Sequence, residues 1–182
     1  MPISIHRPFL ETLEISTGNV ATVNDLFDST KFNNGARSSP GAATYISDSS
    51  GRLRKYRYVR HNPTAAVTEI VGPVYWKDNT FTVVTPTRSE SVFGDTINAL
   101  AGILLNTGVT DGNFVWIQTF GFLAAMPVPA STAASDALVT ATGAQQLARV
   151  AAATAPTGRV AAWAITAVAG GVSDVLIAVE DL

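Results

Sequence analysis

The chain has 182 residues, enough for one domain with a buried core, and its formal net charge of −2 with 14% charged residues shows no excess of either sign. These totals argue against a nucleic-acid-binding domain and against a protein that binds membrane surfaces. Without cysteine the chain can form no disulfide and no thiolate, so stability must come from packing or from assembly. Only two of the twelve Lys and Arg residues, Arg149 and Arg159, follow residue 100, and this weakly charged C-terminal part favours surface buried between subunits.

Residues 1–44 are predicted to form an extended N-terminal arm, because they mix charges with turn formers and show no sustained hydrophobic period. A short helical turn over residues 22–27 is the one element expected within the arm. The N-terminus lacks the apolar run of a secretory signal, so we expect synthesis in the cytoplasm without export. The longest uncharged run, between Asp111 and Asp136, contains two prolines and a strand-like pattern, which argues against a transmembrane helix.

Residues 45–182 are predicted to form a single, mainly β domain, a small barrel or sandwich with little helix. Its first hairpin joins Tyr45 and Ile46 to residues 52–60 through a turn at residues 48–51. The second strand of this hairpin interleaves basic and aromatic residues, and its candidate contact residues are Arg52, Arg54, Tyr56, Arg57, Tyr58 and Arg60.

Two interpretations of this basic strand stay open. One is a solvated edge strand that its charges protect from aggregation. The other is a contact strip for an acidic protein surface, in which the arginines supply hydrogen-bond donors and the tyrosines supply apolar area. Nucleic acid is a weaker third option, because the strip is short and the chain as a whole is acidic.

Further along the chain, residues 71–76 and 80–85 form a second strand–turn–strand pattern. Residues 93–105 are ambiguous, because they fit a helical period, whereas residues 101–105 alone fit a buried strand. Residues 137–142 and 145–151 fit either a hairpin or a short Ala-rich helix. Residues 160–168 and 172–179 flank Gly170-Gly171, which is a strong hairpin signal.

The segment 112–123 is predicted to be the central strand of the fold. A period of two places Phe114, Trp116, Phe120 and Phe122 on one face, interrupted only by Gln118. Val115, Ile117 and Leu123 fall on the other face. A strand that is apolar on both faces belongs inside a sheet or barrel, or has one face covered by a partner chain.

The sequence contains no recognisable catalytic, metal or cofactor motif. Its two histidines, His6 and His61, lack the spacing of metal ligands, and there is no nucleophile elbow, phosphate-binding loop or dinucleotide fingerprint. We therefore expect no enzymatic activity, no cofactor and no bound metal.

Five segments follow one another in a recognisable order. They are a Gly turn at residues 48–51, a "YxYV" strand at residues 56–60, an "AGI" segment from Ala101, a "GxxxWIQ" strand from Gly112, and a terminal Gly-turn hairpin. This order resembles a group of tailed-bacteriophage virion proteins that decorate or cement the capsid. The resemblance covers about residues 45–179, and the chain departs from the compact members in its longer arm and in the Ser/Pro-rich turn at residues 38–41.

The resemblance implies a structural protein on the capsid surface of the virion, bound to the major capsid protein as a homo-oligomer, with a trimer expected. From the composition we expect no nucleic-acid or membrane partner. The alternatives are another phage structural part (a head fibre, a tail or baseplate component, or the main shell subunit) and, less favoured, a cellular carbohydrate-binding module or enzyme.

Overall fold

The computed structural model describes residues 43–47, 52–64, 70–93, 99–105, 107, 109, 111–112, 114–141, 145–156 and 159–179. The predicted arm, with its helical turn at residues 22–27, lies outside these residues apart from the start of the first strand. Within the described part the strands are β1 (Ala43–Ser47), β2 (Leu53–His61), β3 (Gly72–Trp76), β4 (Val83–Thr85), β5 (Leu100–Leu104), β6 (Phe114–Pro127), β7 (Ala137–Thr140), β8 (Leu147–Val150), β9 (Val160–Ala164) and β10 (Val172–Ala178). A short 3-10 turn, η2 (Arg88–Glu90), lies between β4 and β5. The predicted mainly β fold is confirmed.

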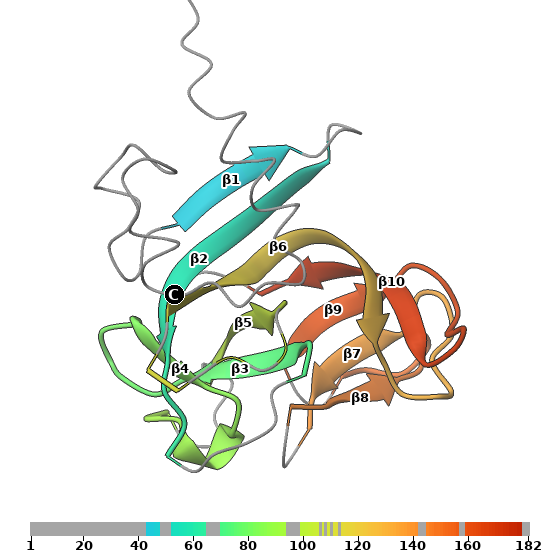
Figure 1. Cartoon of the computed structure of the whole chain (residues 1–182). Coiled ribbons are helices and arrows are strands. Elements are labelled where there is room, and N and C mark those ends of the chain that lie inside the picture. The colour runs from blue at the N-terminus through green and yellow to red at the C-terminus, as the bar shows by residue number, and fades with distance from the viewer. Residues whose placement is uncertain are drawn as a thin grey trace, which may run out of the picture.

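Five of the strands close into a small barrel. The hydrogen-bonded order β2-β4-β3-β5-β6 returns to its start because β6 also pairs with β2 (Figure 1). The barrel is filled by inward side chains of all five strands, including Val59, Val74, Val84, Leu104 and Ile117. The closed sheet buries its own hydrogen-bonding edges and therefore fits the sequence-based expectation of a barrel.

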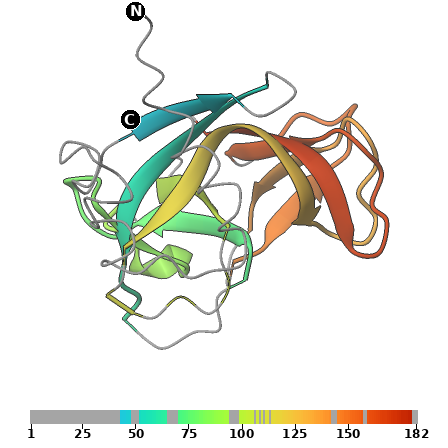
Figure 2. The ribbon, with the colours of Figure 1, turned by 45° about the horizontal axis from the view of Figure 1, so that its top comes forward.

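A second layer continues from the barrel through β6. Beyond its pairing with β2 and β5, β6 pairs with β10, and the sheet then runs through β9 and β7 to β8. These strands lie to one side of the barrel in both views (Figures 1 and 2). A second core fills the space between this layer and barrel strands β3 and β5, where Tyr75, Leu100 and Ile103 meet Leu138 and Ile177. Every residue of β3 and β5 is consequently buried.

The strand predicted to be central is shared by the two layers. β6 is 14 residues long; Val115 and Ile117 enter the barrel core, whereas Leu123 packs against the second core. Its register against β2 shifts between the pairs Tyr56–Gln118 and Lys55–Phe120. The extra residue is a β-bulge, so the strict alternation assumed for Phe114 to Phe122 does not continue through it.

The hairpin predictions can be compared strand by strand. β1 pairs with β2, β3 with β4, and β9 with β10, each in the antiparallel sense expected. In the two ambiguous segments the described residues form strands, since residues 100–104 form β5 and residues 137–140 and 147–150 form the antiparallel pair β7–β8. Residues 94–98, over which the helical period was predicted, lie outside the described residues. Burial decides the first case, because β5 is covered on each face and a helix there would leave β3 and β6 without the strand that pairs with both. No helix among the described residues is long and apolar enough to cross a membrane.

Candidate interaction surface

The two sets of residues singled out in the sequence lie on neighbouring strands. The basic strand is β2 and the aromatic strand is β6, and they run antiparallel with Tyr58 opposite Trp116 and Arg60 opposite Phe114. Residues that are about sixty positions apart in the sequence are thus direct cross-strand neighbours. Figure 1 shows the two strands side by side along the upper part of the barrel.

The interpretation of β2 as a solvated edge strand is wrong. β6 pairs with β2 over residues 55–60, while β1 and β4 pair with residues 53–57 and 60–61. The strand therefore has neighbours on both sides, and its charges do not protect an open edge. In the sequence, the alternation of charged and apolar residues in β2 is typical of an edge strand. This alternation does not show that β6 pairs with β2 and closes the barrel.

The tyrosines of the basic strand are buried, which corrects the expectation that they supply contact area to a partner. The ring of Tyr58 stacks on that of Phe114 at a centroid distance of 5.4 Å and lies 5.1 Å from that of Trp116. Tyr58 has no exposed surface, and Tyr56 and Trp116 are each 5% exposed. Burial raises the pKa of the Tyr58 hydroxyl, because the phenolate would lose its hydration. These rings stabilise the β2–β6 pair from within the chain.

The arginines of β2 and Arg52, which directly precedes the strand, divide into two groups. Arg57 pairs with Ile117, whose side chain lies in the barrel core, and its guanidinium lies 5.0 Å from the centre of the Trp76 ring. Burial lowers the pKa of Arg57, although an arginine remains charged at any physiological pH. Arg52 and Arg60 are exposed, and Arg60 Nε donates a hydrogen bond of 3.2 Å to the Gly112 carbonyl. The exposed positive charges of this stretch are therefore Arg52 and Arg60, whereas Arg54, Lys55 and Arg57 are half-buried.

Where β6 leaves the barrel, its aromatic residues reach the surface. The Arg52 guanidinium lies 3.7 Å from the centre of the Phe122 ring, and that of Arg54 lies 6.0 Å away. Phe120 is exposed. Of the four predicted aromatic residues, Trp116 is thus buried, Phe114 and Phe122 are partly buried, and Phe120 faces solvent.

This surface extends onto residues that the sequence did not single out as a site. Phe122 lies opposite Leu176 on β10, and Leu176 lies opposite Trp163 on β9. Both Leu176 and Trp163 are exposed. The Gly170-Gly171 turn predicted the hairpin but not its register. Residues 165–168 are irregular and shift the register between β9 and β10, so the distance of each residue from the turn does not predict that Leu176 lies opposite Trp163.

A polar cluster at one end of the barrel gathers a carboxylate, an amine and two threonines. The Glu90 carboxylate accepts hydrogen bonds from Thr64 N and Thr85 Oγ1, each at 2.8 Å, and lies 3.5 Å from Lys77 Nζ. Burial acts to raise the pKa of Glu90, but these hydrogen bonds outweigh it and lower the pKa. Lys77 Nζ also donates to the Asn62 carbonyl at 2.7 Å. The cluster links η2 to the end of β3 and to the end of β2, so we interpret its role as stabilising the fold.

His61 lies beside this cluster and has no exposed surface. Its Nδ1 is 4.0 Å from an oxygen of Asp111. Burial lowers the pKa of His61, the Asp111 carboxylate acts in the opposite direction, and Lys77 lowers it further. The described residues contain no group of three His, Asp or Glu side chains that could hold a metal ion.

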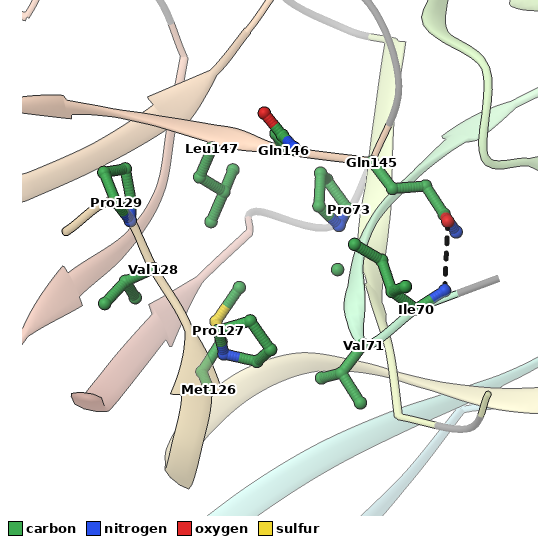
Figure 3. A pocket seen from close by; sticks show the side chains of 11 residues that line it. Ile70, Val71, Pro73, Met126, Pro127, Val128, Pro129, Gln145, Gln146 and Leu147 are labelled. Atoms are coloured by element: carbon green, nitrogen blue, oxygen red, sulfur yellow. Dashed lines mark hydrogen bonds between the residues drawn. The ribbon is translucent and has the colours of Figure 1, made fainter. Parts of the chain in front are cut away.

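A cavity of about 250 Å³ lies between the start of β3, the end of β6 and the start of β8. Figure 3 shows its apolar wall, to which Pro73, Pro127 and Pro129 contribute. Gln145 Oε1 accepts a hydrogen bond of 3.0 Å from Ile70 N beside the cavity (Figure 3). None of the described lining residues is ionisable, so the cavity offers no acid, base or nucleophile.

Comparison with protein-family models gives no match to the chain, and neither does comparison with characterised proteins. The candidate interaction surface therefore stands on its own geometry.

Proposed function

We propose that this chain is a structural virion protein that decorates and stabilises the head of a tailed bacteriophage, binding the major capsid protein as a homo-oligomer. The observation that carries the proposal is the surface formed by β2, β6, β9 and β10, where exposed arginines border exposed apolar side chains. Arginine and aromatic residues together dominate the energetics of protein interfaces.

The arrangement of the resembling segments supports the same proposal. The "YxYV" segment lies on β2, the "AGI" segment on β5 and the "WIQ" segment on β6. These strands are hydrogen-bonded neighbours in the barrel, with β6 between the other two. Three of the segments that carry the resemblance therefore make up one continuous part of the sheet.

The test is co-sedimentation of the purified chain with expanded capsids that lack it. The wild-type chain should sediment with the capsids. A chain that stays in the supernatant at every concentration would refute the proposed function.

The arginine contact is tested with the double variant Arg52→Glu, Arg60→Glu, because both side chains are exposed and their reversal leaves the cores intact. The double variant Arg88→Glu, Arg159→Glu is the control, since it changes the net charge equally at positions away from residues 52–60. We expect the first variant to bind capsids more slowly, with a larger difference at low ionic strength, because salt screens steering between exposed charges. Equal binding by the two variants would exclude a capsid contact through Arg52 and Arg60.

The arm is tested separately by removing residues 1–42. We expect weaker capsid attachment by a chain whose β domain still unfolds cooperatively. A truncated chain that binds as tightly as the complete one would show that the arm does not contribute.

The proposal includes no catalytic activity and a trimeric state. A screen of esters, phosphates and glycosides should show no turnover, and turnover that was lost in His61→Ala would contradict this.

Light scattering should give three times the mass of one chain, whereas a chain that is monomeric both in solution and on the capsid would contradict the trimer.

A further inference from the structure

An apolar row crosses the outer face of the second layer. It consists of Phe122 on β6, Leu176 on β10 and Trp163 on β9, which are successive cross-strand neighbours. Leu176 and Trp163 are each 40% exposed. Phe120 at 42% and Ile165 at 47% extend the row on either side.

The shape and size of the apolar row suit a protein partner. Large side chains exposed to this extent leave on the order of a few hundred Å² of apolar surface in water, comparable to the largest patch on a typical monomer. The row lies on a sheet face, and the cavity between β3, β6 and β8 is lined by other residues, so a small ligand would find little enclosure here. A stable protein interface buries about 800 Å² on each partner, for which the row would form the apolar centre.

Charges of opposite sign border the apolar row. Arg52 stacks on Phe122, and Arg54 approaches the same ring. Asp174 precedes Leu176 by two residues on β10, so the two side chains share one face of the strand. Asp174 Oδ1 accepts a hydrogen bond of 3.1 Å from Ala125 N, which holds the carboxylate at the edge of the row.

We propose that the apolar row binds a second copy of this chain, with Arg52 of one copy facing Asp174 of the next. The inference rests on the homo-oligomer in the proposed function and names the surface that forms it. A surface that carries a cation on one side and a carboxylate on the other is complementary to itself, whereas a uniformly acidic partner would be repelled by Asp174. When the Arg52 end of the row on one copy contacts the Asp174 end of the row on the next, the contact is head-to-tail. Such a contact forms a ring where the rotation between copies closes, as a trimer requires, and an open filament otherwise.

The first test measures self-association by sedimentation velocity over a range of concentrations. Leu176→Lys introduces a charge at the centre of the row while leaving the cores unchanged, and we expect at least a tenfold weaker association. Val92→Lys is the matched control, because Val92 is 53% exposed and lies outside the row. A wild-type chain that stays monomeric at all concentrations, or a Leu176→Lys variant that associates like the control, would overturn the inference.

The second test exchanges the charges. Arg52→Asp and Asp174→Arg should each weaken association, and the double variant with both changes should restore it, because an Asp at 52 would then face an Arg at 174 of the next copy. Asp174→Asn keeps an acceptor for Ala125 N and removes only the charge, so weaker association by this variant separates the electrostatic contact from any loss of folding. A double variant no better than the single ones would overturn the pairing of Arg52 with Asp174.

Capsid co-sedimentation distinguishes this inference from the proposed function. Self-association through the row without capsid binding would refute the function and leave the inference standing. Capsid binding by a Leu176→Lys variant that associates like wild type would refute the inference alone.

Discussion

Gly121 lies against the backbone of Leu53 so closely that a Cβ atom at position 121 would overlap the Leu53 carbonyl oxygen. Gly121 also has a φ of 99°, a conformation that side-chain-bearing residues rarely adopt. It is located where β6 passes from the barrel to the second layer. The path of the central strand thus depends on the absence of a side chain at this position.

Gly121→Ala should therefore lower the free energy of unfolding by about 2 kcal/mol or more, because backbone strain adds to the overlap. Gly170→Ala is the control, since Gly170 has a φ of 61° but a Cβ atom there would meet no atom within 4 Å beyond its chain neighbours. Urea denaturation should show a clearly smaller loss for Gly170→Ala. Equal losses would mean that the contact with Leu53 does not matter.

The second prediction concerns Asp136, whose carboxylate is buried where β7 begins. It accepts hydrogen bonds from Ala133 N at 2.7 Å, Ala152 N at 3.0 Å and Arg149 Nε at 2.5 Å. The bond from Ala133 N and that from Arg149 lower the pKa of Asp136. A lowered pKa in the folded state means that its contribution to stability is complete above the unfolded value of about 3.9 and is lost as the pH falls through the folded value.

Asp136→Asn should consequently lower the melting temperature at neutral pH, and the difference from wild type should narrow in acid. Arg149→Met removes one donor and leaves the two backbone bonds, so its effect should be smaller. Thermal melts of the three proteins at neutral and acidic pH test this. A difference between Asp136→Asn and wild type that does not change with pH would contradict the assignment.

The third prediction follows from the burial of His61. Burial lowers the pKa of His61, so the unfolded chain takes up a proton on this residue before the folded chain does. Its contribution to stability is therefore complete above the unfolded value of about 6.5 and is lost as the pH falls from there to the folded value. This direction is the reverse of that for a histidine with a raised pKa.

The melting temperature of wild type should accordingly fall as the pH is lowered through about 6.5, and this slope should flatten in His61→Gln. His6→Gln, at the second histidine of the chain, should keep the wild-type slope. A slope that survives His61→Gln would contradict the prediction.

The fourth prediction separates Arg57 from the exposed arginines of β2. A carboxylate over the Trp76 ring would meet the negative face of its π system, so Arg57→Glu should destabilise the chain by about 1 kcal/mol or more. Arg60→Glu, at an exposed position, should change stability by no more than about 0.5 kcal/mol. Chemical denaturation of the two variants provides the comparison, and equal stability would place Arg57 outside the barrel.

Much of the local structure was readable from the sequence. The turn residues at 48–51 and at Gly170-Gly171 predicted antiparallel pairs between consecutive segments, and β1–β2 and β9–β10 are such pairs. The two apolar faces of β6 predicted a central strand, because period-two alternation is a property of the chain itself. The bulge at Thr119 could not be seen, since one extra residue leaves no mark in hydrophobicity.

The pairing of strands far apart in the sequence was decided only by the tertiary structure. β2 has the pattern of a charged edge strand, yet β6, some sixty residues later, closes the barrel against it and buries Tyr58 beside Trp116. The apolar row arises in the same way, because Phe122, Leu176 and Trp163 become neighbours only through the registers of β6, β10 and β9. The sequence by itself predicted the strands with a clear period of two and the turns that join β1 to β2 and β9 to β10, since those depend on neighbouring residues. It left β5, β7 and β8 open between strand and helix, and only the tertiary structure decided them. Which strands lie together, and so which side chains share a surface, depends on how the whole chain buries its two cores.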